Sequence, residues 1–314
     1  MLRLRVQVTA FTWRLFVLSV AAVALLYCAR VDAQGSPSGD QPYSRTHVFT
    51  NYGNIQSTQQ QVFLMGNDKP LPFSLSGSVQ KWNTGPNQDN LYTQMFQGLY
   101  RINDRWNVIF SEIYQRQGDI QLANAAVGFN FVPDNDWSIN ASLGLGAGYS
   151  YTYKYSLLFS PQYRLPFDFN GRKAFAVETA LNYQEFSSGS FIQIVPKLNF
   201  QISETLPPIS IGYAFGNFKN TGSQKINQYY QPKTSNGAMI SASVRLTDNS
   251  FAIFSYYPYN KNIIGGNTVS QDTIGATWNY KVANSVHLSI FGQYQNTRNS
   301  SVDVSFGGSV NFSF

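Results

Sequence analysis

The chain has 314 residues, a formal net charge of +6 and a mean hydropathy of −0.22, with 16% aromatic and 12% charged residues. A helical membrane protein would be far more hydrophobic, and so mild a positive charge does not favour a nucleic-acid partner. High aromatic content beside ordinary hydropathy is typical of a transmembrane β-barrel, where lipid-facing apolar residues alternate with polar residues of the lumen.

The first 33 residues have the features of a cleaved export signal. Three arginines precede an uncharged apolar run over residues 15–26, and Ala33 ends a stretch suited to processing. A retained anchor is the alternative, but the run is shorter than the ~20 residues of a spanning helix. Cleavage removes the only cysteine, Cys28. It also removes four arginines and Asp32 from the 22 basic and 16 acidic residues, which leaves 18 and 15, a net charge of +3.

Residues 34–71 are polar and differ from the rest of the chain. The part from Gln34 to Gln61 is rich in Ser, Gln, Asn, Gly and Pro, and the run Gln61-Val62-Phe63-Leu64-Met65 follows it as the apolar piece. This composition favours a periplasmic tail with one short strand or docking piece. A plug folded into the lumen is the alternative.

From residue 72 to residue 314, apolar side chains recur at every second position in about fourteen segments. In residues 137–148, apolar residues from Trp137 to Ala147 share one face and Ser, Asn and Gly occupy the other. The pattern predicts an all-β fold, a transmembrane antiparallel β-barrel of about 14 strands, with 12 or 16 left open. The predicted strands are 72–83, 91–102, 106–117, 121–132, 137–148, 153–165, 173–186, 191–203, 209–218, 237–246, 251–259, 269–281, 286–296 and 302–314.

Tight turn sequences alternate with more variable connections along this region. The tight turns lie at 103–105, 133–136, 169–171, 247–249 and 283–285, and the longest other connections are 219–236 and 260–267. Outer-membrane barrels have short periplasmic turns and longer outside loops. The sequence therefore predicts insertion into the outer membrane of a Gram-negative bacterium from the periplasm. A soluble sandwich is the alternative, but it has no reason to start strands with Trp106, Trp137 or Phe251 after these turns.

The chain ends within a predicted strand. Val310, Phe312 and Phe314 alternate with polar residues, a pattern that resembles the signal read by barrel-assembly machinery, although Ser309 stands where that signal prefers Gly. Because a closed barrel has no free edge, the last strand is expected to pair with the first. The expected partners are this machinery, outer-membrane lipid and lipopolysaccharide.

Candidate catalytic groups are few. His287 and Ser289 lie on one face of a strand, as an activated serine requires, and the lipid A deacylase family uses this spacing. The pair follows a turn assigned to the periplasm and has no carboxylate nearby in sequence, so we expect ordinary lumen residues. No cysteine or histidine cluster has metal-ligand spacing, and the glycines of 144–148 match a phosphate loop only loosely. We predict no catalytic residue, cofactor or metal.

Five charged residues are predicted to line the lumen, namely Lys154, Arg164, Glu178, Lys197 and Arg245. A hairpin at 187–190 would place Glu178 opposite Asn199 and diagonal to Lys197, within reach of long side chains. Two interpretations stay open: a salt bridge that stiffens the wall, and a role in selectivity. The excess of basic residues predicts a mild anion preference for an open pore.

The longest predicted loop is basic. Lys219, Lys225 and Lys233 lie in it without an acidic residue, together with Tyr229 and Tyr230. Lipopolysaccharide phosphates or an acidic surface polysaccharide would be attracted by the charge, and the tyrosines could stack on sugar rings. Solubility and simple loop packing are the alternatives.

Residues 107–166 resemble the YaiO-type outer-membrane barrels. The matching pieces are Pro133-Asp134-Asn135-Asp136-Trp137-Ser138 and Tyr163-Arg164-Leu165-Pro166. The resemblance implies a monomeric barrel of poorly defined role that is associated with surface-glycan or exopolysaccharide systems, and it transfers no catalytic residue. We expect a non-enzymatic protein. We therefore expect a role in glycan export or envelope structure. A passive diffusion pore is the second expectation, because barrels of this size approach those that leave an aqueous channel, and a barrel enzyme is the third.

Overall fold

The computed structural model describes residues 73–83, 90–118, 120–134, 136–148, 153–169, 172–186, 189–201, 208–220, 234–264, 267–297 and 302–313. The predicted signal peptide, residues 34–71, and Lys225, Tyr229, Tyr230, Lys233 and Phe314 lie outside the described residues. Within these ranges, no helix has the length and apolar character needed to cross a bilayer.

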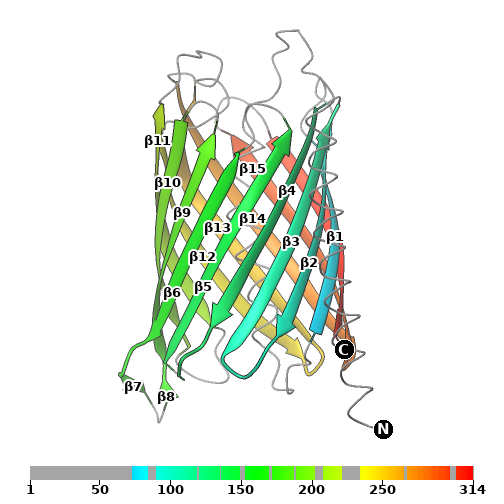
Figure 1. Cartoon of the computed structure of the whole chain (residues 1–314), viewed down its shortest axis with the longest axis vertical. Helices are drawn as coiled ribbons and strands as arrows, with labels where there is room; N and C mark the ends of the chain where they lie inside the picture. The colour runs from blue at the N-terminus through cyan, green and yellow to red at the C-terminus, as the bar shows by residue number, and fades with distance from the viewer. Residues whose placement is uncertain are drawn as a thin grey trace.

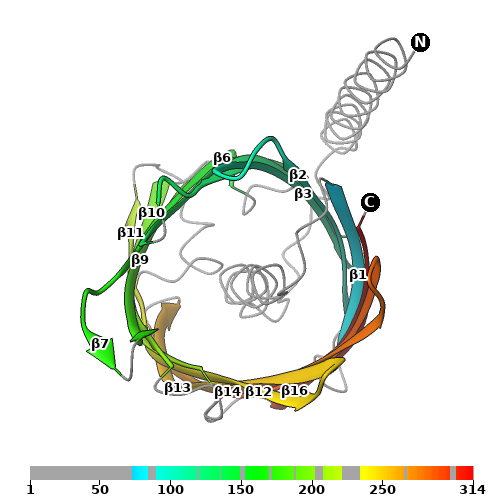
Figure 2. The same ribbon diagram turned by 90° about the horizontal axis from the view of Figure 1, so that it is seen from below.

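The described residues form a closed barrel of fourteen antiparallel strands (Figures 1 and 2). Neighbours along the chain are neighbours in the wall, and β16 pairs with β1 to close it, as expected. The predicted barrel of 14 strands is confirmed. The strands are β1 (Phe73–Asn83), β2 (Leu91–Arg101), β3 (Trp106–Gln117), β4 (Ile120–Phe131), β5 (Trp137–Gly148), β6 (Tyr155–Arg164), β9 (Phe175–Phe186), β10 (Gly189–Phe200), β11 (Ile209–Asn220), β12 (Thr234–Thr247), β13 (Ser250–Ile264), β14 (Asn267–Ala283), β15 (Val286–Thr297) and β16 (Val302–Ser313).

The two faces of the wall differ in polarity as the period of two requires. Apolar side chains on the outer face are exposed, for example Leu143 at 45%, Phe306 at 58% and Ile290 at 61%. Side chains on the alternate positions point into the barrel, and many are polar and buried, such as Asn130 and Gln295. Such a wide apolar exterior is unsuited to water, and lipid is the solvent that explains it.

The barrel has two distinct ends. The end where β1 starts and β16 finishes also carries the connections 102–105, 132–136, 248–249 and 284–285, and we name it the turn end. The opposite end is named the loop end. The sequence prediction assigns the turn end to the periplasm.

Two of the connections at the turn end share one turn chemistry. The Oδ1 atom of Asn103 accepts a hydrogen bond from the backbone N–H of Trp106 at 3.0 Å, and Oδ1 of Asp134 accepts one from Trp137 at 2.9 Å. Such Asx turns set where the next strand begins.

Both tryptophans then pack on a neighbouring strand at this end of the outer face. The ring centroid of Trp106 lies 4.2 Å from that of Phe131, and the centroid of Trp137 lies 4.7 Å from that of Tyr163. These aromatics form an interface belt. Phe251 does not belong to it, because it pairs with Arg245 on the lumen face.

The structure corrects three sequence expectations about connections. The tight turn predicted at 169–171 is part of a longer connection that contains a small hairpin, β7 (Asp168–Phe169) and β8 (Arg172–Lys173), which projects from the turn end (Figure 1). The loop predicted at 260–267 is mostly strand, since β13 and β14 remain paired up to Ile264 and Asn267. Lys219 lies in β11, paired with Ser190, and not in a loop. Polar residues at these strand ends interrupt the alternation of apolar and polar residues, so the sequence does not predict them. Backbone pairing does not depend on side-chain polarity.

Candidate functional site

The lumen is the candidate site. Its five predicted charged residues lie at different positions between the turn end and the loop end. Arg164 ends β6 at the turn end and is exposed, and Arg245 lies near the end of β12 with a side chain 70% exposed. Lys154 precedes β6 at the loop end and is exposed. Glu178 and Lys197 alone among the five are enclosed, with side chains 22% and 13% exposed. The charges therefore stand mainly at the rims.

Glu178 and Lys197 form an ion pair on the lumen face. The Nζ atom of Lys197 lies 3.2 Å from Oε1 of Glu178, and the same oxygen accepts a hydrogen bond from the Ser160 hydroxyl at 2.9 Å. The pair joins β10 to β9, and the hydroxyl joins β9 to β6. This cluster ties three adjacent strands together across the wall.

The register of this pair differs from the prediction. Glu178 stands directly opposite Lys197, and Asn199 stands opposite Ala176. The prediction assumed a loop at 187–190, whereas Phe186 pairs with Gly189 and two residues make the connection. A loop shorter by two residues moves the opposite partner by two positions.

Four basic residues surround the turn end of the lumen, and we name them the basic collar. Arg101, Arg164, Arg245 and Lys281 each occupy a lumen-face position at the end of a strand or within two residues of it. Their strands are β2, β6, β12 and β14, so the collar is distributed around the ring seen in Figure 2. The mouth at this end thus has positive charge on several sides.

Sequence reasoning missed Arg101 and Lys281. Both precede a turn, as Arg164 and Arg245 do, and that shared position was the available signal. For Arg101 the signal was obscured, because apolar residues occur on both faces of β2. Position relative to a turn is a better guide here than hydropathy.

Two members of the collar are tied to an aspartate of the following turn. The Nη2 atom of Arg101 lies 2.5 Å from Oδ1 of Asp104, and Nη2 of Arg245 lies 3.0 Å from Oδ1 of Asp248. Both aspartate side chains are almost fully exposed, at 94% and 97%. Water screening keeps the energy of each pair small, but at a distance each aspartate balances the charge of its arginine.

The lumen face in the loop half is lined differently, by amides and hydroxyls. Nε2 of Gln115 donates to Oγ1 of Thr93 at 3.2 Å, and Nε2 of Gln80 donates to Oγ of Ser305 at 2.9 Å. Nε2 of Gln271 donates to Oγ1 of Thr297 at 3.3 Å. Asp303 of β16, opposite Gln295, is fully buried on the same face, so the wall here is polar and includes a carboxylate.

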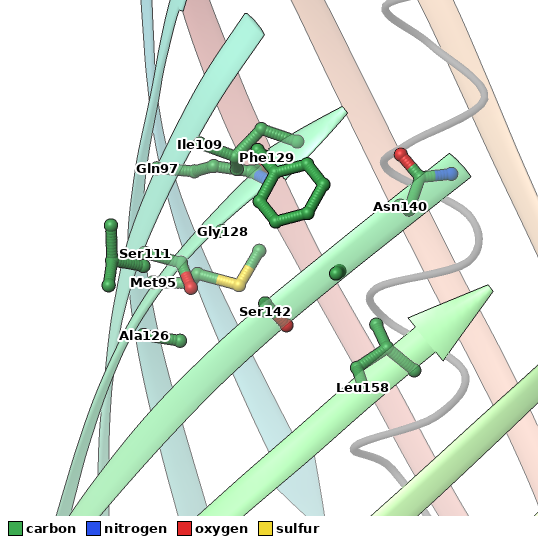
Figure 3. A pocket seen from close by; sticks show the side chains of 12 residues that line it. Met95, Gln97, Ile109, Ser111, Ala126, Gly128, Phe129, Asn140, Ser142 and Leu158 are labelled. Carbon is green, nitrogen blue, oxygen red and sulfur yellow. The ribbon is translucent and has the colours of Figure 1, made fainter. Parts of the chain in front are cut away.

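A shallow recess lies on the lumen side of β2 to β6 (Figure 3). Small residues, Ala126, Gly128 and Ser142, form part of its lining, together with Met95 and Leu158. The volume of the recess is about 30 Å³. Ligand sites for small molecules are roughly tenfold larger, so this recess is a contour of the lumen wall and not an enclosed site.

In the His287 and Ser289 pair, the serine is bonded to a residue of the neighbouring strand. The Ser289 hydroxyl donates to Oδ1 of Asn279 at 2.6 Å, directly across from it on β14. His287 stands opposite Lys281 on one side and Asn311 on the other. In the described part of the chain, no group of three or more His, Cys, Asp or Glu residues could hold a metal ion.

The residues of the predicted assembly signal lie on the closing strand. Val310 pairs with Leu288 and Gly77, and Phe312 pairs with Val286 and Leu75, so β16 is held on both sides. Phe312 is 45% exposed on the outer face, next to the turn end. Phe312 therefore faces outward, while recognition by assembly machinery stays a prediction.

No protein-family model matches the sequence, and no curated protein matches it. Solved structures of outer-membrane channels are similar in fold. The CymD monoaromatic hydrocarbon channel is 9% identical with a TM-score of 0.55, over 78% of this chain and 89% of that chain. The Pseudomonas putida toluene transporter TodX is 8% identical with a TM-score of 0.50, over 79% and 90%. A bacterial polysaccharide outer membrane secretin is 10% identical with a TM-score of 0.50, over 79% and 100%.

Identities this low establish the shared architecture and nothing about solutes. The fold is that of the outer-membrane β-barrels. The YaiO-type resemblance stays a prediction.

Proposed function

We propose that this protein is a passive diffusion channel of the outer membrane, without enzymatic activity, that prefers small anionic solutes mildly. The observation that carries the proposal is the basic collar at the turn end of the lumen. Positive side chains around the mouth of a channel raise the local concentration of anions. The channel-like architecture of the similar solved structures supports the same reading.

The dimensions of the barrel allow such a path. Fourteen strands spaced ~4.8 Å apart and tilted by ~40° enclose a wall of radius ~14 Å. Inward side chains narrow this to a bore between the filled eight-stranded barrels and the open porins of 16–18 strands. Because the collar is partly balanced by Asp104 and Asp248, the selectivity is expected to be modest.

Planar-bilayer recording of the purified mature protein tests the proposal. In a salt gradient we expect stepwise conductance and a reversal potential on the anion side. A reversal potential on the cation side would show that the basic collar does not set the ion preference of the channel. Complete absence of conductance, with the barrel shown to be folded by its heat-modifiable migration on gels, would remove the channel itself.

Export of a surface glycan is the second candidate function. The sequence analysis ranked it above diffusion. The observation that favours it is the location of the collar, because with the turn end in the periplasm an acidic polysaccharide would meet Arg101, Arg164, Arg245 and Lys281 on leaving the cell. Loss of surface polysaccharide in a deletion strain, with unchanged uptake of small anions, would favour export over diffusion. The reverse result would favour the channel.

The enzyme candidate has the weakest support. In a serine hydrolase of this kind the hydroxyl would face the imidazole, whereas Ser289 donates to Asn279. We expect Ser289→Ala and His287→Ala to leave lipid A and phospholipid composition of the outer membrane unchanged. Altered lipid turnover in either variant would restore the enzyme candidate.

A further inference from the structure

Two basic side chains face outward at the loop end of the first three strands. Outward positions are odd-numbered on β1 and even-numbered on β2 and β3, as the exposed Val79, Tyr92 and Trp106 show. Lys81 and Arg116 share this outer face, and Tyr92 stands opposite both of them in the strand pairing. Arg116 is exposed and Lys81 is half-buried. We name Lys81, Tyr92 and Arg116 the basic row.

The height of the basic row matches the upper boundary of the apolar band. Trp106 belongs to the aromatic belt at the turn end, and Arg116 is ten residues further along β3. At ~3.3 Å per residue and a strand tilt of ~40°, the two residues are ~25 Å apart along the membrane normal. The apolar band of an outer-membrane barrel is ~25 Å tall. With the turn end in the periplasm, the basic row therefore lies at the headgroup level of the outer leaflet.

Both cations are held in place without being neutralised. Nζ of Lys81 lies 5.8 Å from the centroid of the Tyr92 ring, a cation–π distance. Nε of Arg116 donates to the carbonyl oxygen of Gly118 at 3.2 Å, and this bond uses one of the five N–H donors of the guanidinium. Neither cation forms an ion pair with a carboxylate of the described residues. The basic row thus presents two charges that are available to an anion.

The outer face on the other side of the barrel carries mixed charge at the loop end. Lys219 faces outward near the end of β11, opposite β1 in the ring (Figure 2), and it pairs with Ser190, which in turn pairs with Glu185. Glu112 also faces outward on β3, but it is four residues from Arg116 and thus ~10 Å deeper in the apolar band. The basic row is therefore a local excess of positive charge at the headgroup level.

The surface beside and below the basic row suits acyl chains with polar groups at their roots. Gln94 faces outward on β2, two residues from Tyr92 toward the turn end, and is exposed. An amide that faces hydrocarbon without a hydrogen-bond partner is costly. Val79, opposite Gln94, and Phe306, opposite Lys81, are apolar and exposed at 56% and 58%. The amide therefore indicates a polar partner just below the headgroups, between apolar side chains.

We propose that the basic row binds the phosphorylated glycolipid anchor of lipopolysaccharide, with its phosphates at Lys81 and Arg116 and its acyl chains against the outer wall. Lysine and arginine bind phosphate through charge-assisted hydrogen bonds. Their strands are two apart, ~10 Å at the backbone, so the long side chains can share one phosphate or hold two. Amide and hydroxyl groups at the roots of the acyl chains can bond Gln94. The site lies on the wall, separate from the long loop, and does not rest on the proposed channel.

Native mass spectrometry of the mature protein in detergent tests the site, with purified rough-type lipopolysaccharide as the probe. The double variant Lys81→Ala with Arg116→Ala is compared with the unmodified protein. Lys219→Ala is the matched control, because it removes an outward cation at the loop end of another strand. A second double variant, Lys81→Arg with Arg116→Lys, keeps both charges. Each protein is first confirmed to fold by its heat-modifiable migration on gels.

We expect the alanine double variant to bind the probe about tenfold more weakly, the effect of losing ~1.4 kcal/mol of charge-assisted bonding. Lys219→Ala should keep the affinity of the unmodified protein, and the charge-keeping variant should recover most of it. Lipopolysaccharide from which the phosphates have been removed should bind the unmodified protein and the alanine double variant equally, because the row then has no anion to recognise.

Four results would overturn the proposal. Unchanged affinity of the alanine double variant would remove the site, and an equal loss in Lys219→Ala would replace it with diffuse attraction. Displacement of the probe by millimolar inorganic phosphate would indicate an anion site without a lipid. A mass of two barrels that disappears in the alanine double variant would assign this face to a second copy of the chain. None of these results depends on conductance, so the lipid site and the channel can fail separately.

Discussion

The charge of the collar makes a quantitative prediction about ion selectivity. Arg164 is the member to change, because it is exposed at the end of β6 and no ion pair with it is described. An arginine reaching ~6 Å inward from a wall of radius ~14 Å places its charge ~8 Å from the axis. At that distance in water a unit charge contributes ~0.5 kcal/mol, and a Debye length of ~10 Å at ~0.1 M salt reduces this to ~0.2 kcal/mol.

The substitution Arg164→Glu changes the local charge by two units. It therefore disfavours a monovalent anion and favours a monovalent cation by ~0.5 kcal/mol each, a difference of ~1 kcal/mol at the mouth. A free-energy difference of ~1.4 kcal/mol changes an equilibrium constant tenfold, so the anion-to-cation permeability ratio is expected to fall about fivefold. Reversal potentials in a potassium chloride gradient, measured at low and at high salt, give this ratio directly.

The control is Lys219→Glu, which makes the same change of charge on the outer face near the loop end. It is expected to leave the ratio within about 1.5-fold of the unmodified protein, because lipid and the wall separate it from the ion path. Equal effects of the two substitutions would refute the assignment of the collar to the mouth. An Arg164→Glu effect that persists undiminished at ~1 M salt would refute the screened electrostatic origin.

Three further predictions concern the stability of the wall, measured as the free energy of unfolding in urea with the protein in lipid vesicles. In a double-mutant cycle with Glu178→Gln and Lys197→Met, we expect a coupling energy of ~1–2 kcal/mol, because the pair is mostly enclosed; additive single effects would show that the ion pair contributes nothing. Trp137→Ala is expected to destabilise by ~1–3 kcal/mol through loss of the Tyr163 contact and interface burial, and Trp137→Phe to recover more than half of this; equal losses in the two variants would contradict a ring contact. A Cβ at Gly98 would meet the far end of the Phe110 ring, so Gly98→Ala requires that side chain to turn aside and should cost ~0.5–1.5 kcal/mol, and Phe110→Leu in the same chain should remove part of that cost; an unchanged cost in the double variant would place the strain elsewhere.

The positions of the strands could be read from the sequence with small errors. The predicted 106–117 and 137–148 agree with β3 and β5, because alternation and the Asx turns before Trp106 and Trp137 are local features of a few residues. The extra length of β13 and β14 could not be read, because the polar residues 260–262 show no alternation. Their pairing comes from the backbone of the neighbouring strand.

The candidate site was only partly predictable. The sequence placed Arg164 and Arg245 on the lumen face, but it did not group them with Arg101 and Lys281, which are far apart in the chain. A collar forms only when strands β2, β6, β12 and β14 bring their ends to one rim. The direct contact between Glu178 and Lys197 likewise depended on a two-residue connection that residue pattern alone did not specify.

The sequence by itself determined that this chain forms a barrel of about fourteen strands and, for most strands, which face is outward, because a period of two and turn residues act over neighbours in the chain. The tertiary structure decided the number of strands among the three that the sequence allowed, and it decided the register and the collar. Register depends on loop lengths and bulges, and the collar depends on closure of the ring.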